Sequence, residues 1–307
     1  MSATGGTRAI IAALLANLGI AVTKFIAYLV SGSSSMLAES IHSLADSGNQ
    51  VLLLIGGKRA RREATALHPF GYGRERYVYA FIVSIVLFTV GGLFSVYEGV
   101  HKIQHPEPIR EAWLPITVLL IAMVLEGLSL RTAVGESNRV RPPGQGWVQF
   151  IRRAKAPELP VVLLEDTAAL LGLVLALFGV LTAVVTGDGV WDGVGTIMIG
   201  VLLVAVAVVL GIETKSLLLG EGASVADVQA IEQALTVGDG GIARIIHMKT
   251  LYLGPDELLV AAKVAITKAD TGADIAAAID AAETRIRAAV PVARVIYLEP
   301  DLDRGPA

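Results

Sequence analysis

Six long apolar runs, separated by polar segments, fill roughly the first two thirds of the chain. They cover residues 10–30, 35–57, 77–100, 113–134, 160–185 and 190–212. A stretch of about 20 predominantly apolar residues is long enough to cross a bilayer as a helix. The pattern therefore predicts a membrane α-helical bundle of six transmembrane helices.

From about residue 224 the pattern changes to that of a small soluble domain. Helical periodicity is expected over 225–237 and 271–289, and alternation typical of strands over 242–252, 257–267 and 294–298. The order α-β-β-α-β predicts a two-layer, ferredoxin-like α+β domain. We expect a transmembrane domain at 1–220 and a cytoplasmic C-terminal domain at 221–307.

Composition supports the membrane interpretation. Hydrophobic residues make up 54% of the chain and charged residues only 17%, with a mean hydropathy of +0.64. The formal charge of −3 argues against a nucleic-acid partner, and the absence of cysteine excludes disulfides and thiolate metal sites. The first residues lack the pattern of a secretory signal, so we expect the first run to be a permanent span.

Basic residues predict the orientation of the bundle. The loop at 58–76 and the segment 131–155 each hold six Lys or Arg, whereas the turns after the first and fifth spans hold none. By the positive-inside rule, both termini and the two basic loops are expected to face the cytoplasm, or the equivalent side of an organelle membrane.

The second span carries ionisable groups where a membrane disfavours them. Its polar residues fall within an arc of about 100° on one helix face: Glu39, His42, Asp46, Asn49 and Gln50. His42 and Asp46 stand four residues apart, so both side chains can reach one point beside the helix. An imidazole and a carboxylate at this spacing make half of a divalent metal site. The alternative is a helix end that dips its polar face into water.

The fifth span supplies adjacent acids, Glu165 and Asp166. Asp46 and Asp166 would give two carboxylates and His42 one nitrogen, and three ligands with an open position suit a Zn²⁺ site that must release its ion. Ligands must be deprotonated, so metal and protons compete, which is sufficient for proton-coupled antiport. The alternative is that Asp166 pairs with Lys24 or caps a polar cavity; Lys24 itself is expected to snorkel or to be paired.

Other polar residues are weaker candidates. Glu126, in the fourth span, is expected to pair with Arg131 or to move protons, and Asp192 is expected to face water at the outer end of the sixth span. His68 and Tyr72 allow a loop metal site, against the alternative of a solvated basic loop. His247, with no second histidine nearby, is interpreted as an ordinary histidine on a strand.

Three segments carry a family resemblance: SGSSSMLAESIHSLAD in the second span, HPFGYGRER after it and LLEDTA in the fifth. With them, the chain resembles the cation diffusion facilitators, closest to the branch that includes the mitochondrial zinc transporter of animals. The resemblance implies a homodimer that exchanges Zn²⁺ for protons at a tetrahedral site in the membrane. His42 and Asp46 match the second-span ligands, and Asp166 matches the last ligand of the fifth span.

The chain departs from the family at several ligand positions. The remaining fifth-span ligand, usually histidine, falls on Val162, and Glu165 is the substitute that the sequence offers, unless water completes the shell. In the loop His68 matches a ligand of a secondary site. The other family ligand positions hold residues that predict no strong cytoplasmic metal cluster: Thr65, Tyr72, Ile246, Tyr297 and Glu299.

The leading hypothesis is therefore a secondary transporter, not an enzyme, that exports Zn²⁺ from the cytoplasm in exchange for protons. A Mn²⁺ or Fe²⁺ transporter is the first alternative, because a carboxylate-rich site is not exclusive to zinc. An intramembrane metallohydrolase would need a cluster such as H-E-x-x-H, which the chain lacks. A transport-inactive scaffold is the remaining alternative. With no transit peptide evident, we expect a multi-pass protein of a prokaryotic inner membrane.

Overall fold

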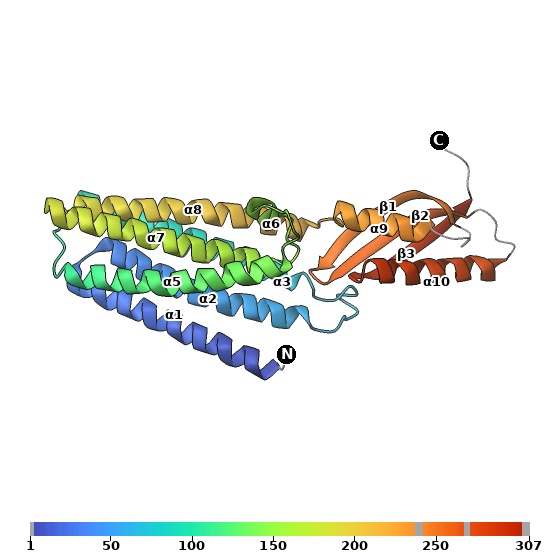
Figure 1. Cartoon of the computed structure of the whole chain (residues 1–307), viewed down its shortest axis with the longest axis horizontal. Coiled ribbons are helices and arrows are strands. Elements are labelled where there is room, and N and C mark those ends of the chain that lie inside the picture. Colours follow the sequence, from blue (N-terminus) through green and yellow to red (C-terminus); the bar gives the residue numbers. More distant parts are fainter. Residues whose placement is uncertain (1–2, 237–241, 267–270, 303–307) are drawn as a thin grey trace. The chain divides into compact units, whose positions relative to one another are not determined.

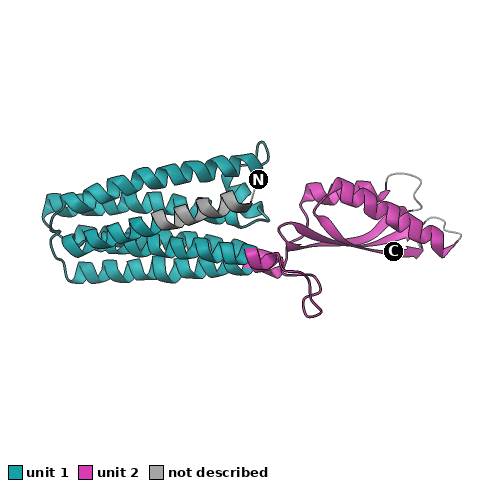
Figure 2. Cartoon of the chain, turned by 90° about the horizontal axis from the view of Figure 1, so that it is seen from below, with its two compact units in different colours: residues 1–57, 78–214 teal, residues 58–77, 215–307 magenta. Residues whose placement is uncertain are grey.

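The structure, a computed structural model, describes the backbone of residues 3–236, 242–266 and 271–302, with side chains from Asn17 onward. The chain forms two compact units (Figure 2). The helical unit comprises Met1–Gly57 and Val78–Thr214, and the C-terminal unit comprises Lys58–Tyr77 and Lys215–Ala307. The predicted domain boundary at 220 lies close to Lys215, but the C-terminal unit also takes in the loop that follows the second apolar run.

Long helices lie side by side in the helical unit (Figure 1). They are α1 (Ala3–Ser31), α2 (Ser34–Ala60), α5 (Trp113–Val140), α7 (Glu158–Thr186) and α8 (Val190–Leu219), with the third apolar run divided into α3 (Glu75–Val86), the π-helical η1 (Leu87–Leu93) and α4 (Phe94–Gln104). A helix satisfies its backbone hydrogen bonds internally, as a bilayer requires. A short helix that the sequence pattern did not predict, α6 (Trp147–Arg153), interrupts the basic segment before α7.

Within the described residues, four helical segments are long and apolar enough to cross a membrane: 75–104, 113–140, 158–186 and 190–219. In α1, the apolar part with described side chains is the shorter Asn17–Ser31. The α2 helix carries the polar face predicted above, which lowers its hydropathy. Large apolar side chains such as Val124, Leu128 and Val201 are exposed on the helical unit, which suits a lipid-facing surface.

Glycines let α8 approach two neighbouring helices closely. A Cβ on Gly99 of α4 would lie 2.8 Å from the carbonyl oxygen of Gly193, and one on Gly179 of α7 would lie 3.2 Å from the Cα of Gly195. Neither position has room for a larger side chain. Small residues at such crossings allow membrane helices to pack backbone against backbone.

Asp192, at the start of α8, holds the N-terminal turn of α2. Its buried carboxylate accepts hydrogen bonds from the Ser33 hydroxyl at 2.9 Å, from the Ser34 N–H and hydroxyl at 2.6 and 3.1 Å, and from the Ser35 N–H at 3.3 Å. The N–H groups of a first helical turn have no intrahelical partner and favour an anion. The expectation that Asp192 faces water is therefore wrong. We call Asp192 with Ser33, Ser34 and Ser35 the Asp192 clasp.

The C-terminal unit contains α9 (Val225–Thr236), β1 (Ile242–Gly254), β2 (Glu257–Ile266), α10 (Gly272–Ala289) and β3 (Ala293–Leu302), in the predicted order. The sheet order is β1-β2-β3, with β1 antiparallel and β3 parallel to β2. Both helices lie on the same side of the sheet (Figure 2). Thr271 and Asp274 form a capping box that begins α10, and β3 is longer than the predicted 294–298.

The basic segment 58–77 packs against the β1–β2 hairpin within the C-terminal unit. Arg76 donates to the Asp256 carboxylate at 2.9 Å, and Gly73 lies so close to Gly254 that a Cβ on Gly73 would fall 3.0 Å from its Cα. The sequence predicted a loop here, and most of 61–74 is indeed non-helical. Its packing on the hairpin was not predicted.

Candidate metal centre

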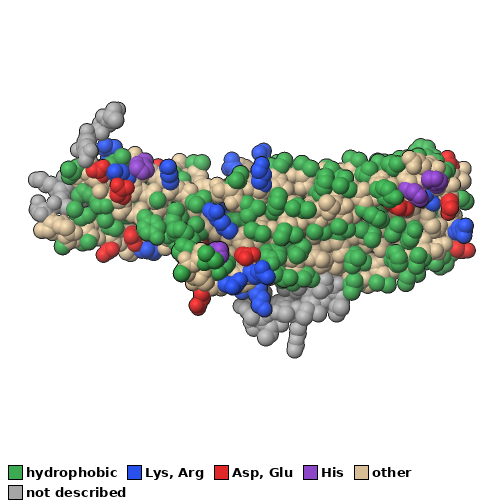
Figure 3. Space-filling view, turned by 180° about the vertical axis from the view of Figure 1, so that it is seen from behind, with side chains coloured by type: hydrophobic (Ala, Val, Ile, Leu, Met, Phe, Trp, Pro, Cys, Tyr) green, Lys and Arg blue, Asp and Glu red, His purple; other side chains and the backbone are tan. Residues whose placement is uncertain are grey.

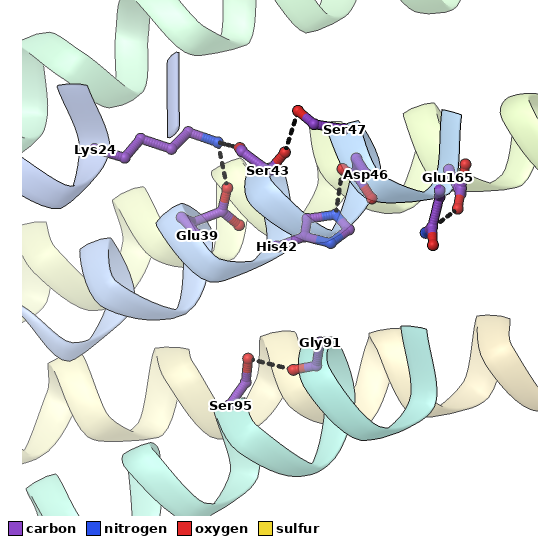
Figure 4. Close-up of polar contacts among 10 residues, drawn as sticks. Lys24, Glu39, His42, Ser43, Asp46, Ser47, Gly91, Ser95 and Glu165 are labelled. Carbon is purple, nitrogen blue, oxygen red and sulfur yellow. Dashed lines mark hydrogen bonds and ion pairs between the residues drawn. The ribbon is translucent and has the colours of Figure 1, made fainter. Parts of the chain in front are cut away.

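The polar face of α2 brings His42 and Asp46 into contact. Four residues apart on one helix, their side chains meet with His42 Nε2 3.5 Å from Asp46 Oδ2 (Figure 4). The His42 side chain is only 1% exposed. Within the described part of the chain, neither ring nitrogen of His42 nor Oδ1 of Asp46 has a hydrogen-bond partner. Buried polar atoms without partners are costly, and those retained in a fold call for an explanation such as a ligand.

Asp46 lines a polar cavity formed by four helices of the helical unit. Asp46 comes from α2, and Glu165 and Asp166 come from α7. The remaining lining residues come from α1, α2, α5 and α7: Asn17, Ile20, Ser43, Gln50, Glu126, Ser129 and Val162. Carboxylates from separate helices thus converge on one space among otherwise apolar helices.

The two acids of α7 are held by different neighbours. Asn49 of α2 donates its side-chain N–H to Glu165 Oε1 at 2.7 Å, and Ser129 of α5 donates its hydroxyl to Asp166 Oδ2 at 2.9 Å. Consecutive helical residues point about 100° apart, so one acid faces α2 and the other faces α5. Val162, at the position where the family has its remaining ligand, also borders the cavity.

The structure gathers part of the predicted ligand set. Asp46, Glu165 and Asp166 share the cavity, while His42 contacts Asp46 but does not line it. Among the side chains that the structure describes, no three His, Asp or Glu groups lie close enough to hold a metal ion as they stand. Metal binding at these residues therefore requires the side chains, or the helices that carry them, to move closer to one another.

Lys24 is buried and paired, one of the two outcomes expected for it. Its ammonium donates to Glu39 Oε2 at 2.9 Å and to the Ser43 hydroxyl at 2.8 Å (Figure 4). The alternative in which Lys24 pairs with Asp166 is wrong, since Asp166 binds Ser129. Glu39 is a residue whose role the sequence analysis missed, although it lies on the polar face of α2 three residues before His42.

Glu126 lines the cavity with the candidate ligands. The ion pairs of the described residues do not include one between Glu126 and Arg131, so the expected pairing is not found. Glu126 and Ser129 stand three residues apart on α5 and therefore share the helix face that meets Asp166.

The π-helical segment η1 lies against His42 (Figure 4). A Cβ on Gly91 would lie 4.0 Å from His42 Nδ1, an ordinary van der Waals distance, and 3.2 Å from Leu203 Cδ1. Such segments recur at functional sites because they widen a helix and free backbone groups. The Gly91-Gly92 pair was the only sequence signal for this irregularity.

The candidates outside the membrane helices have other partners. His68 packs on Tyr72 with ring centroids 4.7 Å apart, and the Tyr72 hydroxyl lies 3.3 Å from the Thr65 hydroxyl. His247 is exposed on β1, as expected of an ordinary histidine. No metal cluster appears in the described residues of this unit.

Lys263 of β2 forms ion pairs with two carboxylates of β3. Its ammonium lies 3.1 Å from Glu299 and 3.2 Å from Asp301, and the hydrogen bonds that it donates to these carboxylates raise the pKa of Lys263. Glu299 is one of the positions that matches a family metal ligand.

The sequence match decides the family. The family model of the cation efflux transmembrane domain matches residues 10–219, more than half of the chain. The protein belongs to the cation efflux family. This confirms the resemblance to cation diffusion facilitators, and because members of the family are transporters, it also confirms that this cation efflux protein is not an enzyme.

Named relatives extend the match. Human proton-coupled zinc antiporter SLC30A9, mitochondrial, is 33% identical over 242 residues, covering 78% of this chain and 42% of the relative. Metal tolerance protein C4 of Arabidopsis thaliana is 30% identical over 258 residues, covering 84% and 56%. Zinc transporter ZitB of Pectobacterium atrosepticum is 28% identical over 125 residues, covering 41% and 38%. This cation efflux protein thus spans about two fifths to just over half of the length of these relatives.

Proposed function

We propose that this protein carries Zn²⁺ across a membrane in exchange for protons, using His42, Asp46 and Asp166 as metal ligands. The observation that carries the proposal is the cavity where acids of α2, α5 and α7 converge among apolar helices. Ionisable groups inside a membrane are costly and mark ion pathways. The relative named as a proton-coupled zinc antiporter supports both the ion and the exchange.

The ligands would assemble by a small movement of α7 against α2. His42 and Asp46 already touch on one helix, and Asp166 lies across the cavity from Asp46. Glu165, released from Asn49, is the substitute for the ligand that Val162 lacks. Three or four such ligands bind Zn²⁺ but leave room for its release.

Exchange follows from competition at the same atoms. His42 must be neutral and the carboxylates must be ionised to bind a metal, so metal entry releases protons and protonation expels the metal. The nitrogens of His42 and Oδ1 of Asp46, which have no hydrogen-bond partner among the described residues, are the atoms available for either proton or metal.

The membrane arrangement is part of the proposal. We add α1 and α2 to the four apolar spans, since the polar face of α2 borders α1, α5 and α7 at the cavity. Six spans place both termini and the basic loops in the cytoplasm, with export as the direction. The mitochondrial name of the human relative gives no support to a prokaryotic inner membrane, so we propose only that the protein is multi-pass.

The C-terminal unit is proposed to stabilise a homodimer without binding metal tightly. The weak metal binding is supported by the Lys263 ammonium, which already pairs with Glu299 and Asp301, and the homodimer by the resemblance to cation diffusion facilitators. We take 221–307 as the cytoplasmic domain and 1–220 as the transport domain.

A Mn²⁺ or Fe²⁺ transporter is the second candidate, favoured by one observation. The ionisable side chains that line the cavity are all carboxylates, and His42 is not among the lining residues. Oxygen ligands suit Mn²⁺, whereas an imidazole favours Zn²⁺. The two candidates differ in whether His42 joins the metal.

Metal-driven proton flux in proteoliposomes tests the proposal. Purified protein is reconstituted with a pH-sensitive dye inside, and Zn²⁺, Mn²⁺ or Fe²⁺ is added outside. We expect Zn²⁺ to drive protons across the vesicle membrane in the direction opposite to its own movement. The control variant is Glu136→Gln, which changes an exposed residue of α5 and should keep this activity. Absence of proton flux with every ion, in vesicles that contain folded protein, would favour the scaffold alternative.

A further inference from the structure

Two histidines stand side by side at the end of the third apolar run. His101 and His105, four residues apart, lie in the last turn of α4 and at its C-cap, with ring centroids 4.9 Å apart. Tyr97, one turn earlier, stacks on His101 at 6.4 Å. Both histidines are exposed. Two imidazoles at this spacing on a helix can bind one cation together.

This end of the helical unit lies opposite the basic segments of the chain. Arg110 donates its backbone N–H to Ser31, in the turn between α1 and α2, so the histidines lie near the turns that lack basic residues. The basic segments follow the other ends of α2 and α5. The histidine pair is thus separated along the helices from the loops predicted to face the cytoplasm.

The charges around the pair favour a cation. Glu98, Glu107 and Glu111 lie nearby in the sequence, against Lys102 and Arg110, and Figure 3 shows histidine beside both acidic and basic side chains at one end of the helical unit. Lys102, the nearest lysine in sequence, is buried, and its ammonium donates a hydrogen bond to the Gly32 carbonyl at 2.8 Å. This bond directs the ammonium toward the end of α1. The free carbonyl groups of a helix C-terminus add partial negative charge.

From this arrangement we infer that His101 and His105 form a second metal site, which binds a borderline divalent cation such as Zn²⁺ or Ni²⁺. Two imidazole nitrogens are the protein ligands, and water completes the coordination shell. Imidazole selects these ions over Mg²⁺ and Ca²⁺, which prefer oxygen. No third His, Asp or Glu side chain completes the set in the described residues, so the site exchanges its ion quickly.

The site would bind the cation at the end of the helical unit that lies away from the basic loops. A site with two protein ligands concentrates the ion there without retaining it. This inference does not depend on the proposed intramembrane ligands, because the histidine pair lies outside the cavity that contains Asp46 and Asp166.

Metal titration of the full chain in detergent tests the inference. The starting protein is Asp46→Asn with Asp166→Asn and Glu165→Gln, which removes the carboxylates proposed as intramembrane ligands. Zn²⁺ and Ni²⁺ binding is measured by calorimetry, before and after adding His101→Gln with His105→Gln. The matched control adds His68→Gln with His247→Gln, the two other histidines outside the membrane helices.

We expect the His101/His105 variant to lose one bound Zn²⁺ and one bound Ni²⁺ per chain, while the control keeps them. Equal binding by the two histidine variants, or no binding by the starting protein at neutral pH, would overturn the inference. If wild type and the starting protein bind the same number of ions, the result contradicts the proposed intramembrane site but not the His101/His105 site.

Discussion

Asp192, at the start of α8, and Asp46, on α2, have opposite surroundings. Asp192 accepts hydrogen bonds from Ser33, Ser34 and Ser35 and is fully buried. Asp46 has one contact, to His42 at 3.5 Å, and an oxygen without a partner among the described residues. A carboxylate saturated with donors stabilises a fold, whereas an undersaturated one is a cost that a ligand can offset. The comparison separates a structural acid from a candidate metal ligand.

The largest expected effect is the loss of transport in Asp46→Asn or Asp166→Asn. Loss of a group that hydrogen-bonds to a metal ligand lowers metal affinity or activity by up to about 100-fold. Removing a ligand itself should lower metal flux by more than that. Flux per reconstituted molecule is compared with that of Asp192→Asn, which should remain active once folded. If Asp166→Asn transports normally, the site as proposed is wrong.

Lys24→Met should give the largest loss of stability. It leaves Glu39 as a buried acid without its cation, which costs about 3 to 5 kcal/mol. Thermal unfolding in detergent measures the loss, and the double variant with Glu39→Gln should recover part of it. Unchanged stability of the single variant would show that the pair contributes little.

Breaking the Asp192 clasp should have a smaller effect on stability. Asp192→Ala leaves the Ser34 N–H without its acceptor, at a cost of about 2 to 3 kcal/mol. We expect a lower unfolding temperature with near-normal flux per folded molecule. A variant that is stable but inactive would place Asp192 in the transport machinery and remove the contrast with Asp46.

His42→Asp should alter ion choice more than turnover. The ligand set becomes wholly carboxylate, so preference should move from Zn²⁺ toward Mn²⁺ or Cd²⁺ by about tenfold, which is about 1.4 kcal/mol in relative binding. Uptake of each ion is compared at two pH values and equal protein density. An unchanged ratio between ions would make His42 a structural residue of the polar face.

The smallest effect is expected from Lys263→Met in the C-terminal unit. It frees Glu299 and Asp301 from their ammonium and should add only weak Zn²⁺ binding. Calorimetry on the full chain with and without the substitution measures the difference. Tight binding by the unsubstituted C-terminal unit would contradict the proposal that it holds no metal.

Local patterns in the sequence predicted the features that depend on neighbours along the chain. The helix period placed His42 and Asp46 on one face of α2, and the element order of the C-terminal unit followed from alternation and helical spacing. The ligand role of these residues remains a prediction.

Contacts between distant segments were beyond the sequence pattern. Asp192 meets Ser34 across 158 positions, and Asn49 meets Glu165 across 116, so only packing of the helices reveals these partners. The π-helical segment η1 was not predicted either, because its sequence, LFTVGGL, is apolar like that of the helices around it.

Proton release on metal binding tests the central claim most directly. Zn²⁺ is added to detergent-solubilised protein in a weak buffer, and the protons released are counted for wild type, Asp46→Asn and Asp192→Asn. We predict proton release with bound Zn²⁺ in wild type and Asp192→Asn, and a marked loss in Asp46→Asn. Equal release from wild type and Asp46→Asn would contradict the claim that metal and protons compete at the undersaturated carboxylate.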